Sequence, residues 1–222
     1  ICCYDDEKYY SNDNLMHLVL WNNEILKHQR PEKRWNVKRD GSIHLKYILT
    51  ILCSNTMKYF FSKFLSTDTL QGSYSSIYPE DLRVFPIKNI DINKQQPFIE
   101  KANVMIKKNK EFQIVKDNFL QFLTTKLSIE KPSTKLKNWT DLDAAAFLRE
   151  LKKAKIKLTL DDEKAWLELF EKEKAKAAEI KAVIDSTDRE IDQMVYDLYG
   201  LTNHEIEIVE GDHEKNIMAN LR

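Results

Sequence analysis

The chain has 222 residues, of which 42% are hydrophobic and 32% are charged, and its formal net charge is zero. A chain of this length can hold one large domain or two small ones around a real hydrophobic core, and its composition excludes an intrinsically disordered protein. Only four glycines and five prolines are present, which favours long regular elements, mostly helices, and no apolar run is long enough to cross a membrane.

The zero net charge conceals an uneven distribution along the chain. Residues 1–140 carry 22 Lys and Arg against 15 Asp and Glu, whereas residues 141–222 carry 13 against 20. The basic excess is greatest in Lys27–Lys46, with seven basic and two acidic residues. Such a segment is typical of a polyanion-binding surface, but also of a solvated loop that keeps a protein in solution. The acidity of the second part disfavours contact with DNA there.

The first ninety residues mix strand-like and helical patterns. Residues 1–43 are irregular and partly strand-like, and Leu15–Trp21 carries β-forming residues in partial alternation. Ile43–Leu65 has a helical pattern with a break at residues 53–55, which predicts two helices. Leu70–Ile90 contains one glycine and two prolines among short apolar groups, a pattern typical of loop, strand and turn.

After Gln95 the pattern is helical. Phe98, Met105, Phe112 and Phe119 recur at seven-residue intervals, which predicts an amphipathic helix of roughly thirty residues. Residues 128–135 interrupt it. We expect two further helices, over residues 140–155 and 161–185, so that the second part is an antiparallel helical assembly.

Capping patterns mark several predicted helix ends. Thr140 with Asp143 resembles a capping arrangement that starts the helix ending near residue 155, and Thr187 with Glu190 has the spacing of a capping box. The latter predicts a separate short helix from residue 186 that closes the assembly. Gly200 suits the left-handed residue after a helix end. Thr202 and Glu205 predict a second capping box directly afterwards.

These elements predict an α+β fold that is helix-rich overall. A small mixed α/β recognition domain over residues 1–94 is followed by an antiparallel bundle of long helices over residues 95–222. The chain begins at Ile1 without an initiator methionine or a signal peptide, which we interpret as a fragment of a longer protein.

No catalytic pattern stands out. The chain lacks a Gly-rich phosphate loop, a Gly-x-Ser-x-Gly elbow and a His-Glu-x-x-His motif, and its five histidines lack metal-ligand spacing. Cys2, Cys3 and Cys53 make neither a metal pattern nor a disulfide framework, which favours a reducing, intracellular compartment. We therefore expect no catalysis by this part and no metal site.

The tail "STDREIDQMVYDLYGLTNHEIEIVE" resembles the C-terminal end of many bacterial and archaeal restriction–modification proteins with adenine-specific methyltransferase domains. Four upstream blocks, "YYSNDNLMHLVL", "KYILTILCSNTMKYFF", "GSYSSIYPEDLRVFPIKNI" and "QQPFIEKANVMI", are similar to the TaqI-like specificity domain of those proteins and occur in its order. The family typically shows Leu-Asn-Ser where this chain has Leu52-Cys53-Ser54. No single block is diagnostic, and together they span nearly the whole chain.

The resemblance implies a DNA target recognition domain followed by a helical spacer, at the C-terminal end of a type IIG-like enzyme. The implied partners are double-stranded DNA and methyltransferase or nuclease domains of the same polypeptide, with no membrane partner. The implied location is the prokaryotic cytoplasm. S-adenosylmethionine is implied as cofactor for the parent enzyme, and none for this part, which lacks the family's Gly-rich loop for it and also the Asn-Pro-Pro-Tyr motif that would hold a flipped adenine.

Two segments are candidate DNA-binding surfaces. The first is the basic segment Lys27–Lys46, whose long basic side chains reach phosphates or guanine edges. The second is residues 70–76, where a glycine at residue 72 lets the backbone approach DNA closely. The predicted DNA-binding residues are Arg30, Lys33, Arg34, Lys38, Arg39, Gln71, Ser73 and Tyr74.

Two other interpretations stay open. A specificity subunit of a type I restriction–modification system has comparable recognition domains and spacer helices. A helical protein–protein adaptor has no role with nucleic acid and shows no salt-dependent DNA binding.

Overall fold

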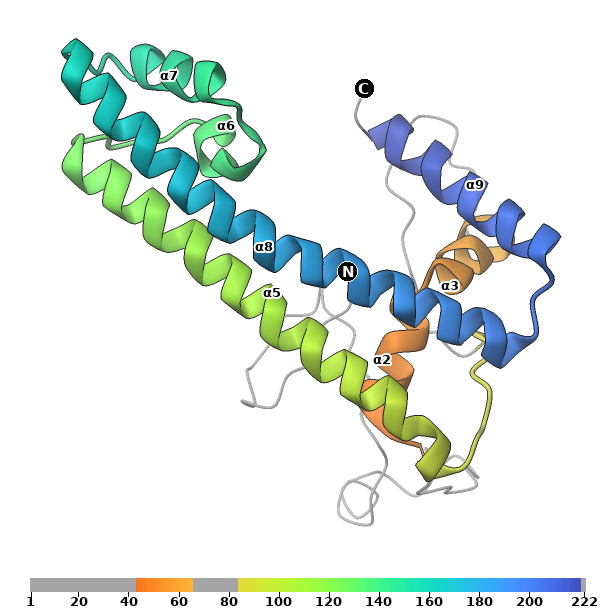
Figure 1. The fold of residues 1–222 in the computed structure, drawn as a ribbon. Helices are drawn as coiled ribbons and strands as arrows, with labels where there is room; N and C mark the ends of the chain where they lie inside the picture. Colours follow the sequence, from red (N-terminus) through yellow and green to blue (C-terminus); the bar gives the residue numbers. More distant parts are fainter. Residues whose placement is uncertain (1–42, 66–83, 221–222) are drawn as a thin grey trace, which may run out of the picture. The chain divides into compact units, whose positions relative to one another are not determined.

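The structure is a computed structural model that describes residues 43–65 and 84–220, without the side chains of residues 212–220. Contacts divide the chain into two compact units: residues 1–103 with 188–222 form unit 1, and residues 104–187 form unit 2. The helices of the described residues (Figure 1) are α2 (Leu45–Cys53), α3 (Asn55–Phe60), the π-helical turn η2 (Phe61–Leu65), α5 (Ile92–Lys126), α6 (Thr134–Lys137), the 3₁₀ turn η3 (Trp139–Asp141), α7 (Ala144–Lys153), α8 (Leu160–Tyr199) and α9 (Asn203–Asn220).

The prediction of an α+β fold is wrong, because the described residues contain helices and no strand. Within Leu70–Ile90, which we expected to include a strand, the described part begins at residue 84 with a turn and a bend and continues without regular structure to residue 90. The Ile87 backbone N–H donates to the Phe85 carbonyl at 2.8 Å, an i to i+2 bond that tightens the chain instead of extending it. The strand-like stretch Leu15–Trp21 lies outside the described residues. The division into a recognition domain over residues 1–94 and a helical bundle over residues 95–222 stays a prediction.

The break predicted between two helices at residues 53–55 is confirmed. Ser54 has extended backbone angles, φ −68° and ψ 157°, and separates α2 from α3. Its hydroxyl donates to the Ile51 carbonyl at 2.7 Å and accepts from the Met57 N–H at 3.4 Å, so one side chain closes α2 and caps α3. A serine at this position therefore turns the chain without leaving backbone groups unpaired.

The core of unit 1 forms where α2 and α3 meet residues of α5, α8 and α9. Tyr47 packs its ring edge-on against Phe98 with the centroids 5.3 Å apart, and α3 packs against α9. The buried apolar residues of this unit are Tyr47, Ile51, Met57, Phe98, Ile99, Ala102, Ile191, Val195, Tyr196 and Val209.

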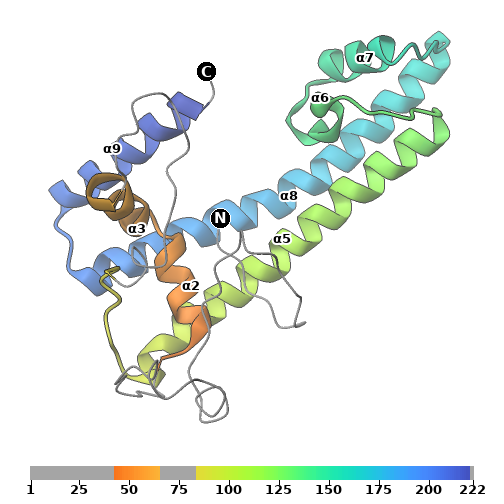
Figure 2. The same cartoon turned by 180° about the vertical axis from the view of Figure 1, so that it is seen from behind.

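Unit 2 is an antiparallel hairpin of two long helices, as expected. Residues 104–126 of α5 and 160–187 of α8 lie side by side in opposite directions, and α6, η3 and α7 cover the end where the chain reverses (Figures 1 and 2). The long helix predicted after Gln95 is confirmed as the 35-residue α5, interrupted by residues 127–133 before α6 begins.

Aromatic rings fill the core of unit 2. Phe147 of α7 stacks on Phe170 of α8 with the centroids 4.3 Å apart, and Phe119 of α5 packs against both. Trp139 is fully buried, and its indole N–H donates to the Lys116 carbonyl at 3.1 Å. The buried residues of this core are Phe119, Leu123, Leu136, Trp139, Leu142, Phe147, Leu151, Phe170 and Ala177.

The separate helix predicted from residue 186 does not form, because α8 continues without a break through residues 160–199. Thr187 lies inside α8, where its hydroxyl donates to the Val183 carbonyl at 2.8 Å, one turn earlier. Glu190 forms an ion pair with Lys101 of α5 instead of turning back to a cap. The Thr-x-x-Glu spacing occurs within a helix here, since a threonine hydroxyl can bond the preceding turn.

The second capping box is confirmed at α9. The Thr202 N–H donates to the Glu205 carboxylate at 2.7 Å, and the Glu205 N–H donates to the Thr202 hydroxyl at 3.4 Å. Gly200 has φ +70° between α8 and α9, as the glycine after a helix end requires. At α7 the capping residue is Asp143 itself, whose carboxylate accepts from the Ala146 N–H at 2.6 Å, and not Thr140.

Candidate functional site

The eight predicted DNA-binding residues lie outside the described part of the chain. The first group falls within residues 1–42 and the second within residues 66–83. What the structure does describe is the point where each segment joins unit 1. The predicted DNA-binding residues concerned are Arg30, Lys33, Arg34, Lys38, Arg39, Gln71, Ser73 and Tyr74.

The end of the basic segment is held by a buried glutamine. The His44 backbone N–H donates to Gln95 Oε1 at 2.8 Å, and Gln95 Nε2 donates to the Ile90 carbonyl at 2.8 Å. Gln95 is fully buried in α5, so these bonds are shielded from water. His44 is also the N-cap of α2, with its Nδ1 accepting from the Lys46 N–H at 3.0 Å. The end of the basic segment is therefore fixed to α5.

The chain that follows the second candidate segment is held by two tyrosines. The Tyr199 hydroxyl donates to the Pro86 carbonyl at 2.5 Å, and the Tyr47 hydroxyl donates to the Lys88 carbonyl at 2.6 Å. Lys88 Nζ in turn donates to the Leu198 carbonyl at the end of α8, at 2.6 Å. Burial raises the pKa of Tyr47 to about 12, so it stays a hydrogen-bond donor at any physiological pH.

A buried carboxylate joins α8 to the start of α3. Asp192 is only 6% exposed, and its Oδ1 accepts from the Asn55 N–H at 2.7 Å. Asn55 is the first residue of α3, where a negative charge is favoured by the helix dipole. Burial nevertheless raises the pKa of Asp192 to about 6, because removing the carboxylate from water costs more than this single bond returns.

The groups around Asp192 come from three helices. The Asn55 N–H and Lys58 of α3 favour its charged form, whereas Asp188 of α8 and Glu210 of α9 disfavour it. The hydroxyl of Tyr196, one turn along α8, lies 3.5 Å from Glu210 Oε1. The contacts of this cluster are internal and hold α8 against α3 and α9, which makes it a structural group and not a catalytic pair.

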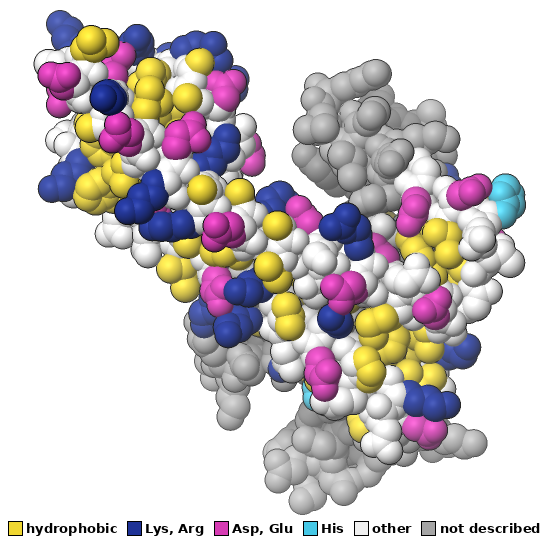
Figure 3. Space-filling view, viewed as in Figure 1, with side chains coloured by type: hydrophobic (Ala, Val, Ile, Leu, Met, Phe, Trp, Pro, Cys, Tyr) yellow, Lys and Arg dark blue, Asp and Glu magenta, His cyan; other side chains and the backbone are white. Residues whose placement is uncertain are grey.

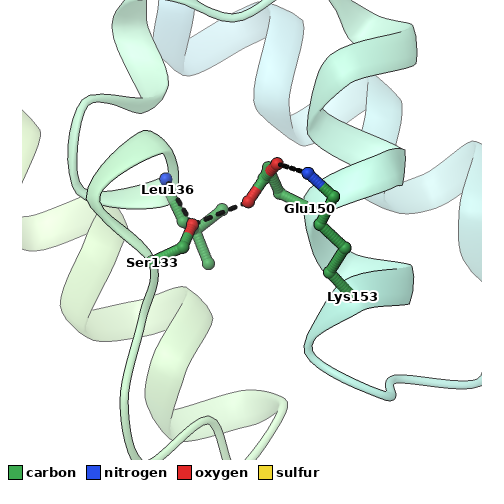
Figure 4. A network of polar contacts seen from close by, with 4 residues as sticks. All are labelled: Ser133, Leu136, Glu150 and Lys153. Atoms are coloured by element: carbon green, nitrogen blue, oxygen red, sulfur yellow. Dashed lines mark hydrogen bonds and ion pairs between the residues drawn. The ribbon is translucent and has the colours of Figure 1, made fainter.

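A second polar network lies at the covered end of the unit 2 hairpin (Figure 4). The Ser133 hydroxyl caps α6 by accepting from the Leu136 N–H at 3.1 Å, and it donates to Glu150 of α7 at 2.7 Å. Lys153 Nζ donates to the other oxygen of Glu150 at 2.8 Å. These bonds, first from Lys153 and then from Ser133, lower the pKa of Glu150. The network ties the loop before α6 to α7.

A hollow of about 340 Å³ lies beside this network, between α6 and α7. Lys135, Arg149 and Lys153 contribute cationic groups to it, and Thr134 and Asn138 add a hydroxyl and an amide. The Asn138 Oδ1 already accepts from Lys116 Nζ at 3.2 Å, which leaves its NH₂ group to donate outward. The arrangement presents donors and positive charge, which suits an anionic oxygen.

Neither a metal site nor a membrane span is found among the described residues. No group of three or more His, Cys, Asp or Glu side chains is placed to hold a metal ion in the part of the chain that the structure describes. Over the same residues, no helix combines the length and apolar character of a membrane span.

Sequence reasoning considered Asp192 only as one of three neighbouring acidic residues, without predicting its burial, and it missed the basic groups near α7. Asp192 lies one turn before Tyr196 on the buried face of α8, so an acidic residue one helical turn from a buried aromatic was the available signal. The basic groups were hidden because we counted charge over halves of the chain. A count over residues 131–157 finds eight Lys and Arg against three Asp and Glu.

Comparison with known proteins assigns no activity. A family model described as a domain of unknown function (DUF8810) matches residues 91–195. The match covers unit 2 with the adjoining parts of α5 and α8, and it leaves out the segments that hold the predicted DNA-binding residues. No curated protein and no solved structure is detectably similar to the chain.

Proposed function

We propose that the chain is the target recognition part of a restriction–modification enzyme, which selects the duplex DNA sequence on which catalytic domains act. Those domains belong to the same polypeptide and methylate adenine with S-adenosylmethionine, in the cytoplasm of a prokaryotic cell. The chain itself contributes recognition and a helical spacer, and no catalytic step.

The observation that carries the proposal is the basic segment Lys27–Lys46, with seven basic residues against two acidic ones. Lysine and arginine at phosphates supply most of the affinity of a protein for duplex DNA. The segment also holds Gln29 and Asn36, whose amides are suited to adenine edges in the major groove. The order of sequence blocks that resemble a TaqI-like specificity domain supports the same function.

The described residues support the proposal through the way both candidate segments are joined to unit 1. His44, within the end of the basic segment, is bonded to buried Gln95. Pro86 and Lys88, further along the chain from the second segment, are bonded to tyrosines. A recognition segment whose end is fixed loses less conformational entropy on binding, which improves affinity and register. These bonds are therefore what a DNA-reading loop needs at its base.

The test is a titration of the chain with a duplex of about 20 base pairs at several salt concentrations. Replacing Arg34 and Arg39 by alanine removes two phosphate-binding groups, so we expect the slope of log affinity against log salt to become shallower by about one unit per lost contact. The matched control is Lys164→Ala with Lys172→Ala, which removes the same charge from exposed positions of α8.

An unchanged slope in the Arg34 and Arg39 variant contradicts the proposal and favours the protein–protein adaptor. Equal losses in this variant and in the control also contradict it, because they indicate unspecific attraction by total charge. A gene with Asn-Pro-Pro-Tyr upstream of the chain supports the fused enzyme over a type I specificity subunit.

A further inference from the structure

The charge of the two units differs from the charge of the two halves of the sequence. Residues 104–187, which form unit 2, carry 18 Lys and Arg against 14 Asp and Glu. The acidic surplus of the second half lies in residues 188–222, which hold three basic and nine acidic residues and belong to unit 1. The expectation that acidity keeps the helical part away from DNA therefore does not hold for unit 2.

The cations of unit 2 concentrate at the covered end of the hairpin. We call residues 131–157, which include α6, η3 and α7, the tip surface. Every one of its eight basic side chains is exposed, and Figure 3 shows lysine and arginine side chains around this end of the molecule. These residues are Lys131, Lys135, Lys137, Arg149, Lys152, Lys153, Lys155 and Lys157.

The acidic residues of the tip surface are largely occupied by the fold. Asp143 caps α7 by accepting from the Ala146 N–H, and Glu150 is buried between Ser133 and Lys153. Lys152 pairs with Glu163, at the start of α8, at 3.4 Å. The other six cations form no ion pair with any residue that the structure describes. Residues 131–157 thus present positive charge that their own carboxylates do not neutralise, although the acidic first turn of α8, with Asp161, Asp162 and Glu163, lies at the same end of the hairpin.

Part of the positive charge of the tip surface surrounds the hollow between α6 and α7. Lys135 and Arg149 line it together with the Thr134 hydroxyl and the Asn138 amide. Two cations and two neutral donors around one concave site match the oxygens of a phosphodiester. Asp141 and Glu150, the latter paired with Lys153, also line the hollow, which limits how many phosphates this site can hold and favours a single contact there.

We propose that the tip surface is a second DNA-contacting surface, which binds backbone phosphates of the duplex through Lys135 and Arg149 with the neighbouring lysines. The choice of duplex DNA as ligand rests on the proposed function. Seven of the eight cations are lysines, flexible point charges that suit phosphate contact without reading of bases. The tip surface contributes affinity and orientation, and the basic segment Lys27–Lys46 contributes specificity.

A membrane surface fits these residues less well. Peripheral membrane helices need an apolar face to insert beside their lysines. On α6, η3 and α7 the large apolar residues are already used in the core, with Leu136, Trp139, Phe147 and Leu151 at most 1% exposed. The helices of the tip surface therefore have charge to offer an anionic partner and no comparable apolar face.

The experiment compares two double variants of the chain. The tip variant carries Lys135→Ala and Arg149→Ala, and the control variant carries Lys164→Ala and Lys172→Ala. The whole 222-residue chain is titrated with a 20-base-pair duplex of arbitrary sequence between about 50 and 200 mM salt. We expect the tip variant to bind several-fold more weakly and its slope of log affinity against log salt to fall by one to two units, about one for each lost phosphate contact. The control should keep the slope of the unaltered chain. Circular dichroism before titration establishes that each variant keeps its helix content.

Three results overturn the inference. The first is a tip variant whose slope equals that of the unaltered chain. The second is an equal fall in the tip variant and the control. The third is tighter binding of the chain to vesicles with anionic lipid than to the duplex, with the difference abolished in the tip variant.

The test separates this inference from the proposed function. Replacing Arg34 and Arg39 addresses the basic segment, and replacing Lys135 and Arg149 addresses unit 2. A fall of slope in the first variant alone leaves the proposed function standing and refutes the tip surface. A fall in the second alone supports the tip surface as a phosphate-binding site and refutes the assignment of Arg34 and Arg39.

Discussion

Asp192 of unit 1 shows how one buried carboxylate ties helix packing to pH. Its hydrogen bond to the Asn55 N–H holds α8 at the first turn of α3. Burial raises its pKa to about 6 from the ordinary value of 3.8. Between these values the folded chain holds a proton on Asp192 that the unfolded chain releases. The contribution of this proton to the unfolding free energy is therefore complete below about pH 4 and is lost as pH rises through 6.

Asp192→Asn tests this contribution. Asparagine keeps a carbonyl oxygen for the Asn55 N–H and never ionises. We therefore expect the unfolding free energy of the variant to lack the decrease that ionisation of Asp192 causes in the unaltered chain between pH 4 and pH 7. The difference in unfolding free energy between variant and unaltered chain should grow by about 2 kcal/mol over that interval, given about 1.4 kcal/mol for each pKa unit. Urea unfolding at a series of pH values measures it.

Asp197→Asn is the control, because Asp197 lies on the same helix and is exposed. The difference in unfolding free energy between this control and the unaltered chain should stay constant over the same pH range. A flat difference for the Asp192 variant as well contradicts the assignment of a buried, protonatable carboxylate at α8.

At the level of elements, three helices end on a residue in the left-handed region. These residues are Ser128 after α5, Lys155 after α7 and Gly200 after α8, with φ values of 53°, 62° and 70°. In each case the following N–H bonds the carbonyl five residues back, as Ile156 does to Leu151 at 3.1 Å. Glycine adopts this conformation freely, whereas a residue with a side chain is strained in it.

Lys155→Gly should therefore stabilise unit 2. Removing the strain of a left-handed lysine gains about 1–2 kcal/mol, and the greater freedom of glycine in the unfolded chain returns part of it. We expect a net gain of about 0.5–1 kcal/mol in unfolding free energy, measured by the urea midpoint at unchanged slope.

The matched control is Lys152→Gly, at the penultimate residue of α7. Its ion pair with Glu163 is exposed and contributes little, so the loss of helix propensity should dominate and lower the unfolding free energy by about 1 kcal/mol. If both glycines destabilise the chain equally, the left-handed conformation of Lys155 is not a source of strain.

For the molecule as a whole, the sequence predicted the length of α5 well but placed a break inside α8 that the structure does not show. The seven-residue repeat of Phe98, Met105, Phe112 and Phe119 predicted the long helix that the structure shows as α5. The Ser54 break and the cap at Thr202 follow from local chemistry, which the sequence displays directly.

The sequence could not predict that α8 runs through Thr187, because the same spacing caps a helix start and occurs inside a helix. Nor could it predict which distant residues form a unit. Asn55 and Asp192 are far apart in sequence and meet only through tertiary packing. No strand forms in residues 84–90, the described part of the segment expected to include one, since Phe85 packs among Phe60 and Phe61 and no neighbouring strand is available among the described residues. The predicted DNA-binding residues stay a prediction.

The last prediction concerns the independence of unit 2. Its aromatic core, from Phe119 to Ala177, lies wholly within residues 104–187. We therefore expect a chain of residues 104–187 alone to be helical and to unfold cooperatively on heating, as followed by circular dichroism. Phe170→Ala should abolish this transition, because Phe170 is fully buried against Phe119 and Phe147 and its truncation costs about 3–5 kcal/mol. Lys172→Ala, an exposed change two residues away, should leave it intact. A gradual, non-cooperative melt of the unaltered segment would show that the hairpin depends on unit 1 for its stability.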